Sequence, residues 1–203
     1  MHDSLHADSV TVLLSALTGG LAGSIFALLS QSFLSWIRKP VLQVSFSATS
    51  PGCDVSTTTN IDNLHQHYLR LKIENVGRTF ARNVSASMTA LVHISATSTK
   101  EDREFAEEVL DMKWSLIGGT RSDIPSRGHR FVDVIHARKF RSDPASGTSI
   151  EFDFHPTPIR LPELGWRRGR YSATIFVAAE NAASISKKIS WSWDETFEGL
   201  RIL

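Results

Sequence analysis

The chain has 203 residues, with 22 Lys and Arg against 21 Asp and Glu and a formal net charge of +1. This balance gives no reason to expect specific nucleic-acid binding. The single cysteine, Cys53, excludes an intrachain disulfide and a multi-thiolate metal site within one chain, and it fits a reducing compartment.

Residues 10–37 contain no charged side chain and follow a short polar tail, residues 1–9. About 20 mostly apolar residues in a helix cross the hydrocarbon core of a bilayer. We therefore predict a transmembrane α-helix over residues 10–37 and an extracytoplasmic tail over residues 1–9. A cleaved signal peptide is the alternative, but the chain lacks a basic region before the apolar run, and the run is long for a signal peptide.

Basic residues flank only the C-terminal end of this run. Arg38 and Lys39 follow it directly, whereas residues 1–9 contain no Lys or Arg. The positive-inside rule therefore places the N-terminus outside and everything after Pro40 in the cytoplasm, at an inner or plasma membrane. Trp36, Arg38 and Lys39 form the predicted anchor at the membrane interface, in contact with membrane lipid.

One face of the predicted helix carries small side chains. Steps of four residues join Ser15, Gly19, Gly23 and Ala27. Small residues allow two transmembrane backbones to approach closely, although Gly and Ala are also common in any transmembrane helix. We predict helix association through this face, and the partner is either another copy of the chain or a different subunit.

Residues 41–203 show the alternation of apolar and polar side chains that is typical of half-buried strands. The longest run holds this period from Val84 through Met88 to Val92 and Ile94. The alternating runs begin at Leu42, Leu69, Val84, Leu110, Phe131, Ile150, Tyr171 and Ile185. About seven to eight strands without a strong helix signal predict a mainly β domain, an antiparallel β-sandwich.

The segment Lys100–Val109 departs from this pattern because it is highly charged and lacks residues that favour strands. We predict a solvated loop or a short helix there.

The stretch Asn75-Val-Gly77-Arg-Thr-Phe-Ala81-Arg-Asn83-Val resembles the N-x-G-x-x-x-A-x-N pattern of CARDB-like immunoglobulin-type domains. In those domains the Asn-x-Gly makes a turn and the Ala-x-Asn-Val opens the next strand. Gly-Arg-Tyr171 is similar to the tyrosine corner of sandwich folds, in which the tyrosine hydroxyl returns to nearby backbone. The resemblance implies an immunoglobulin-like fold and an accessory binding or spacer module, and it implies no activity.

His65 and His67 lie two residues apart, on one face of an extended segment, and are weak candidates for a metal site. Asp62, or Asp153 with His155, would have to complete the ligand set. Alternatively, the two histidines are ordinary polar side chains before a strand. No Ser-His-Asp, Cys-His, paired-carboxylate or HExxH motif appears, so we expect no enzymatic activity, no catalytic residue and no cofactor.

Basic residues cluster at Arg167, Arg168 and Arg170. On a domain tethered close to an inner leaflet, they form a predicted patch for anionic lipid or a phosphate-bearing ligand. Solvated loop charge is the alternative.

Three hypotheses of function follow. The first is a non-enzymatic, membrane-anchored subunit that presents a cytoplasmic immunoglobulin-like β-sandwich for protein–protein contact and assembly at the membrane. The second is a membrane-perturbing effector of a prokaryotic antiviral defence system, in which the sandwich senses a ligand or partner. The third is a metal-assisted hydrolase that uses His65 and His67.

Overall fold

The computed structural model describes residues 24, 30, 39–59, 64–95, 101–104, 109–140, 148–152, 159–160 and 168–203. The chain divides into two compact units, Met1–Lys39 and Pro40–Leu203. Most of the predicted tail and span therefore lies outside the described residues. Within the described part of the chain, no helix is both long enough and apolar enough to cross a membrane.

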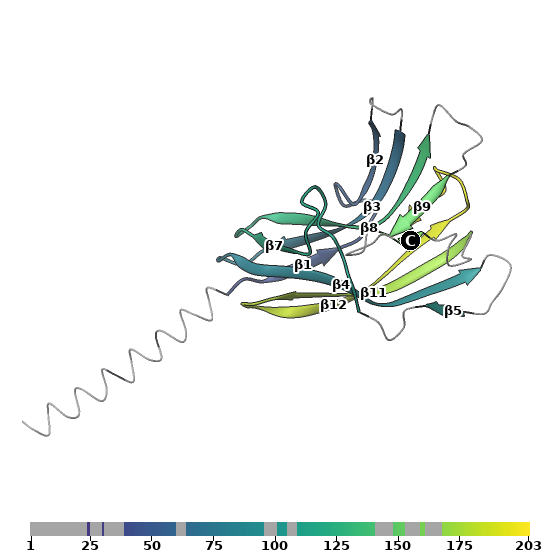
Figure 1. Ribbon diagram of the computed structural model, residues 1–203. Helices are drawn as coiled ribbons and strands as arrows, with labels where there is room; N and C mark the ends of the chain where they lie inside the picture. Colours follow the sequence, from purple (N-terminus) through teal and green to yellow (C-terminus); the bar gives the residue numbers. More distant parts are fainter. Residues whose placement is uncertain are drawn as a thin grey trace, which may run out of the picture. The chain divides into compact units, whose positions relative to one another are not determined.

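The unit Pro40–Leu203 is mainly β and contains two antiparallel sheets (Figure 1). Sheet A consists of β1 (Leu42–Ser45), β2 (Asp54–Thr59), β3 (Leu64–Asn75), β8 (His129–Phe140), β9 (Ser149–Phe152) and β10 (Ile159–Arg160). Sheet B consists of β4 (Ala81–Ser95), β5 (Glu101–Glu104), β6 (Leu110–Asp111), β7 (Arg121–Ile124), β11 (Gly169–Ala179), β12 (Ala182–Trp193) and β13 (Arg201–Ile202).

The described strands number 13, which is more than the seven to eight predicted. No predicted run corresponds to β2, β5, β7, β10 or β13, and of these β10 and β13 have only 2 residues each. A two-residue strand is too short to show an alternating pattern in the sequence, so it is found only through its pairing partner. The prediction of a mainly β, antiparallel fold is confirmed, whereas the predicted strand number was wrong.

Sheet A has the order β1-β3-β8-β9-β10 with β2 also beside β3, and sheet B has the order β13-β12-β11-β4-β5 with β6 and β7 also beside β4. Alternate side chains of both sheets meet in one buried apolar cluster, to which β3 contributes Leu69 and Leu71 and β11 contributes Ile175. The sheets therefore form a β-sandwich around a shared core. Trp191 and Trp193 of β12 are both buried in this cluster.

The alternation of β4 changes face in the middle of the strand. Residues up to Met88 face the core as predicted, but beyond it Leu91 and His93 are buried instead of Val92 and Ile94. The pairing register between β4 and β11 shifts by one residue directly after Met88, which is a β-bulge. The prediction of one continuous buried face was wrong because the bulge turns every later side chain to the opposite face.

Part of the charged segment Lys100–Val109 is a strand. β5 pairs with β4 and lies at the edge of sheet B. The prediction of a loop or helix was wrong for Glu101–Glu104 because backbone groups make the pairing and need no apolar side chains. Charged residues are common on edge strands, where they discourage pairing with other molecules.

The turn between β3 and β4 is built around the buried side chain of Asn75. Its Oδ1 atom accepts hydrogen bonds from the backbone N–H groups of Val41 and Gly77, at 3.2 Å and 3.0 Å. Its Nδ2 atom donates to the carbonyl oxygen of Thr79 at 2.7 Å and to two carbonyl oxygens of the neighbouring loop. β4 begins at Ala81, directly after this turn, as the Asn-x-Gly motif predicts.

Candidate functional site

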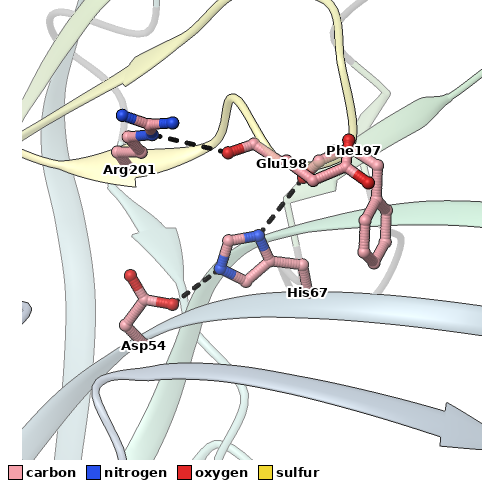
Figure 2. Close-up of polar contacts among 5 residues, drawn as sticks. All are labelled: Asp54, His67, Phe197, Glu198 and Arg201. Atoms are coloured by element: carbon pink, nitrogen blue, oxygen red, sulfur yellow. Dashed lines mark hydrogen bonds and ion pairs between the residues drawn. The ribbon is translucent and has the colours of Figure 1, made fainter.

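His67 of β3 is buried between β2 and the loop that joins β12 to β13 (Figure 2). Its Nε2 atom lies 2.7 Å from Oδ1 of Asp54, and its Nδ1 atom lies 3.3 Å from the carbonyl oxygen of Phe197. A carboxylate and a backbone carbonyl both accept hydrogen bonds, and a neutral imidazole carries only one N–H. His67 therefore satisfies both neighbours at once only when both ring nitrogens carry a proton.

His65 lies on the same face of β3 as His67. Its Nδ1 atom is 3.0 Å from Oγ1 of Thr58, in the adjacent strand β2. The Phe197 ring lies near both imidazoles, with centroid distances of 6.2 Å to His65 and 5.9 Å to His67. The two histidines are thus brought together around an aromatic ring.

The predicted further metal ligands, Asp62, Asp153 and His155, lie outside the described residues. Among the residues that the structure does describe, no group of three His, Cys, Asp or Glu side chains is arranged to hold a metal ion. Asp54, the carboxylate that does contact His67, was not predicted from the sequence. The hairpin pairing of β2 with β3 carries that information, because it sets Asp54 beside Leu69, two residues from His67.

The loop after β12 has a fixed internal conformation. Oδ1 of Asp194 accepts hydrogen bonds from the backbone N–H of Thr196 at 2.9 Å and from its hydroxyl at 2.6 Å. These bonds lower the pKa of Asp194. The indole N–H of Trp193 donates to the carbonyl oxygen of Thr196 at 3.0 Å. The loop thereby presents the Phe197 carbonyl to His67, so this contact joins the end of sheet B to sheet A.

The outer face of sheet A carries charges that are paired with one another. Asp133 accepts hydrogen bonds from Nε of Arg70 at 2.8 Å and from the Ser115 hydroxyl at 2.5 Å. Glu151 lies 3.4 Å from the Arg138 guanidinium and 3.5 Å from Nε2 of His136. This face therefore leaves little charge for recognition of a ligand.

Another ion pair on the same face joins Lys72 to Glu74 at 2.9 Å. The hydrogen bond from Lys72 lowers the pKa of Glu74.

The outer face of sheet B has a different composition. Across β4, β11 and β12, the pairing register places in successive rows Ile94, Arg170 and Ser192; Val92, Ser172 and Ser190; Ala90, Thr174 and Lys188; and Ser87, Phe176 and Ser186. Only Arg170 and Lys188 are charged, and every side chain of the set is at least partly exposed. Phe176 is 38% exposed. We call these residues the outer face of sheet B.

Tyr171 is buried inside the sandwich near the start of β11. Its ring stacks on His93, with centroids 4.7 Å apart, and on Trp191, with centroids 5.6 Å apart. Burial raises the pKa of the Tyr171 hydroxyl, and the nearby carboxylate of Glu195 raises it further. The tyrosine corner itself stays a prediction.

The predicted basic patch is described in part. Arg168 and Arg170 are exposed on either side of the first residue of β11, and Arg167 lies outside the described residues. The backbone N–H of Arg168 lies 3.5 Å from a carboxylate oxygen of Glu195. The patch therefore has an acidic neighbour that the sequence did not indicate.

Lys39 is described and exposed. The other residues predicted for helix association and membrane anchoring lie outside the described part: Ser15, Gly19, Gly23, Ala27, Trp36 and Arg38.

No model of a known protein family matches this chain, and a search of curated proteins finds no relative.

Proposed function

We propose that this chain is a non-enzymatic, membrane-anchored subunit whose immunoglobulin-like β-sandwich holds a partner protein through the outer face of sheet B. The apolar run over residues 10–37 supports the anchor, and the basic pair Arg38 and Lys39 supports a cytoplasmic sandwich. The Asn75 turn and the strand that follows it support the immunoglobulin-like assignment.

The composition of the outer face of sheet B carries the proposal. The cores of protein–protein interfaces are depleted in charged residues and enriched in aromatic ones. This face has Phe176 exposed beside serine and threonine hydroxyls, with Val92 and Ile94 partly exposed. The outer face of sheet A, by contrast, is covered with paired charges such as Arg70 and Asp133.

The test is purification of the full chain in mild detergent from the membrane in which it is naturally made. We expect a complex of fixed stoichiometry with one other protein. Phe176→Glu places a charge in the proposed contact and is expected to dissociate the complex. Gln43→Glu is the matched control, since Gln43 is exposed on β1 of sheet A. A complex that survives Phe176→Glu, or a chain that purifies alone, would contradict the proposal.

Two other results would point to the remaining hypotheses. Growth arrest on overexpression that disappears in Gly19→Leu or Gly23→Leu would favour the membrane-perturbing effector, because both changes disrupt the predicted helix contact. Stoichiometric zinc that disappears in His65→Ala and His67→Ala would favour the metal-assisted hydrolase.

A further inference from the structure

β1 begins and β3 ends at the same end of the sandwich (Figure 1). Three exposed apolar side chains belong to this end. Val41 is 51% exposed, Val76 is 42% exposed and Phe80 is 56% exposed. The backbone N–H of Val76 donates to the carbonyl oxygen of Val41 at 2.8 Å, so the two valines are neighbours. Phe80 ends the turn that Val76 begins. Most exposed apolar side chains of this size occur singly, so such a cluster indicates a contact surface.

Three exposed arginines belong to the same end. Arg78 and Arg82 flank Phe80 in the sequence, and Arg127 lies in the adjacent turn between β7 and β8. That turn is tied to the Asn75 turn, since the Ser126 hydroxyl donates to the carbonyl oxygen of Gly77 at 2.7 Å. Among the described residues, none of these three guanidinium groups forms an ion pair.

Two acids belong to the same end of the sandwich, and both accept hydrogen bonds from Asn83. Asp123 accepts a hydrogen bond from the backbone N–H of Asn83 at 2.8 Å, and Glu180 accepts one from the Asn83 side chain. A hydrogen bond from a neutral amide does not cancel the charge of a carboxylate, so the three arginines outnumber these two acids by one and leave a small excess of positive charge around the apolar side chains. We call the set the basic tip: Val41, Val76, Arg78, Phe80, Arg82 and Arg127.

We propose that the basic tip binds the anionic phospholipid surface of the membrane. Phe80 and the two valines enter the headgroup region, and the three arginines contact lipid phosphates. This inference rests on the anchor in the proposed function, because Val41 is only four residues beyond Ile37, where the predicted span ends. Four extended residues reach at most about 14 Å, so the chain itself keeps the tip within reach of the lipid.

The tip and the basic residues of β11 lie at opposite ends of the sandwich. Gly169, between Arg168 and Arg170, pairs with Ser95 at the end of β4, whereas Arg82 is near the start of that strand. Ser95 lies 13 positions after Arg82 along the strand, which corresponds to about 40 Å. A membrane surface that meets the tip end-on is therefore out of reach of Arg168 and Arg170.

The test uses the full chain in lipid nanodiscs, either pure phosphatidylcholine or with about one-third phosphatidylglycerol. A spin label is attached at Phe80→Cys, and at Thr57→Cys as the control, because Thr57 is exposed on β2 and pairs with Gln66, well away from the Asn75 end of β3. The native Cys53 is completely buried, so it does not compete for the label. Oxygen, which partitions into lipid, and a water-soluble nickel complex serve as the two relaxation agents.

With phosphatidylglycerol present, we expect the accessibility of the Phe80 label to the nickel complex to fall several-fold. The label should remain accessible to oxygen. The Thr57 label stays accessible to nickel in both discs. Reversing the three charges with Arg78→Glu, Arg82→Glu and Arg127→Glu restores nickel access at Phe80. Val76→Cys gives an independent label position if Phe80→Cys impairs folding.

Three results would overturn the inference. If the chain remains with the discs but the Phe80 label stays accessible to nickel, the proposed lipid contact of the tip is wrong. The proposed anchored subunit is not affected by that result. A label shielded from both agents indicates a protein contact at the tip. A chain that does not remain with the discs contradicts the predicted span, and the proposed function fails together with the tip.

Discussion

Lys187 of β12 donates a hydrogen bond from Nζ to the carbonyl oxygen of Val44 in β1, at 2.8 Å, and so joins sheet B to sheet A. β1 is the edge strand of sheet A, and β13 covers β12 only near its C-terminal end. Open strand edges are sites at which other chains can pair. By bonding the Val44 carbonyl oxygen, Lys187 occupies one hydrogen-bond acceptor on the open edge of β1.

We expect Lys187→Met to lower the free energy of unfolding by about 1 kcal/mol, because the side chain keeps its length but no longer donates to Val44. Amide exchange in β1 should become faster. Lys188→Met is the matched control, since Lys188 is exposed on the outer face of sheet B. Thermal unfolding in mild detergent and hydrogen-exchange mass spectrometry measure both effects. If the two variants have the same unfolding free energy and the same amide exchange in β1, the Lys187 contact with Val44 does not stabilise this edge strand.

Asn75→Ala is expected to destabilise the domain by about 2 kcal/mol or more, since buried donors and acceptors around the turn lose their partner. Asn181→Ala is the comparison, because Asn181 also bonds two backbone groups of the same turn region, at 2.9 Å and 2.8 Å, but is exposed. Water replaces its bonds, so we expect a change within about 0.5 kcal/mol. If the two variants lose similar amounts of unfolding free energy, burial of the Asn75 side chain is not the reason for its contribution to stability.

The sequence predicted those parts of the fold that are determined within a single strand or a single turn. Leu69, Leu71 and Ile73 alternate with polar residues, and they fill the core because side chains of a strand point alternately to its two faces. The turn after Asn75 was likewise predictable, since its bonds to Gly77 and Thr79 are local.

The features that the sequence did not predict depend on how one strand pairs with another. The bulge after Met88 is a property of the register with β11, and β5 is a strand because β4 offers it an edge. The contact of His67 with Asp54 arises from the hairpin of β2 and β3. The sparsely charged outer face of sheet B, which includes Phe176, appears only when three strands are aligned side by side.

Gly169→Ala is expected to destabilise the domain by about 1–3 kcal/mol. A Cβ atom there would collide with the carbonyl oxygen of Ile94 and would lie 2.6 Å from Nε2 of His93. The carbonyl is fixed by the sheet and cannot move aside, so we also expect altered near-ultraviolet circular dichroism from the stack of His93 on Tyr171. Gly119→Ala is the control, because its nearest contact would be an ordinary 3.9 Å. An unchanged spectrum in Gly169→Ala would show that β4 and β11 can separate there at little cost.

The Asp194 carboxyl group should make the free energy of unfolding of the domain depend on pH. Its pKa is lowered by the hydrogen bonds from Thr196, so the folded state binds the proton more weakly than the unfolded state does. The ionised carboxylate therefore contributes stability above the unfolded pKa, near 4, and this contribution is lost as pH falls through the lower folded-state pKa.

We expect the stability difference between the unmodified chain and Asp194→Asn to shrink between about pH 5 and about pH 3. Amide exchange of the loop at Phe197 should follow the same course, because the Thr196 bonds hold the loop that contacts His67. Glu74, whose pKa is lowered by Lys72, contributes in the same direction. Glu74→Gln therefore provides a separate background in which the Asp194 effect should persist unchanged, since the two groups belong to different segments. If Asp194→Asn leaves the pH dependence of unfolding unaltered in both backgrounds, the Thr196 bonds do not favour the ionised form, and the loop is held by Trp193 and His67 alone.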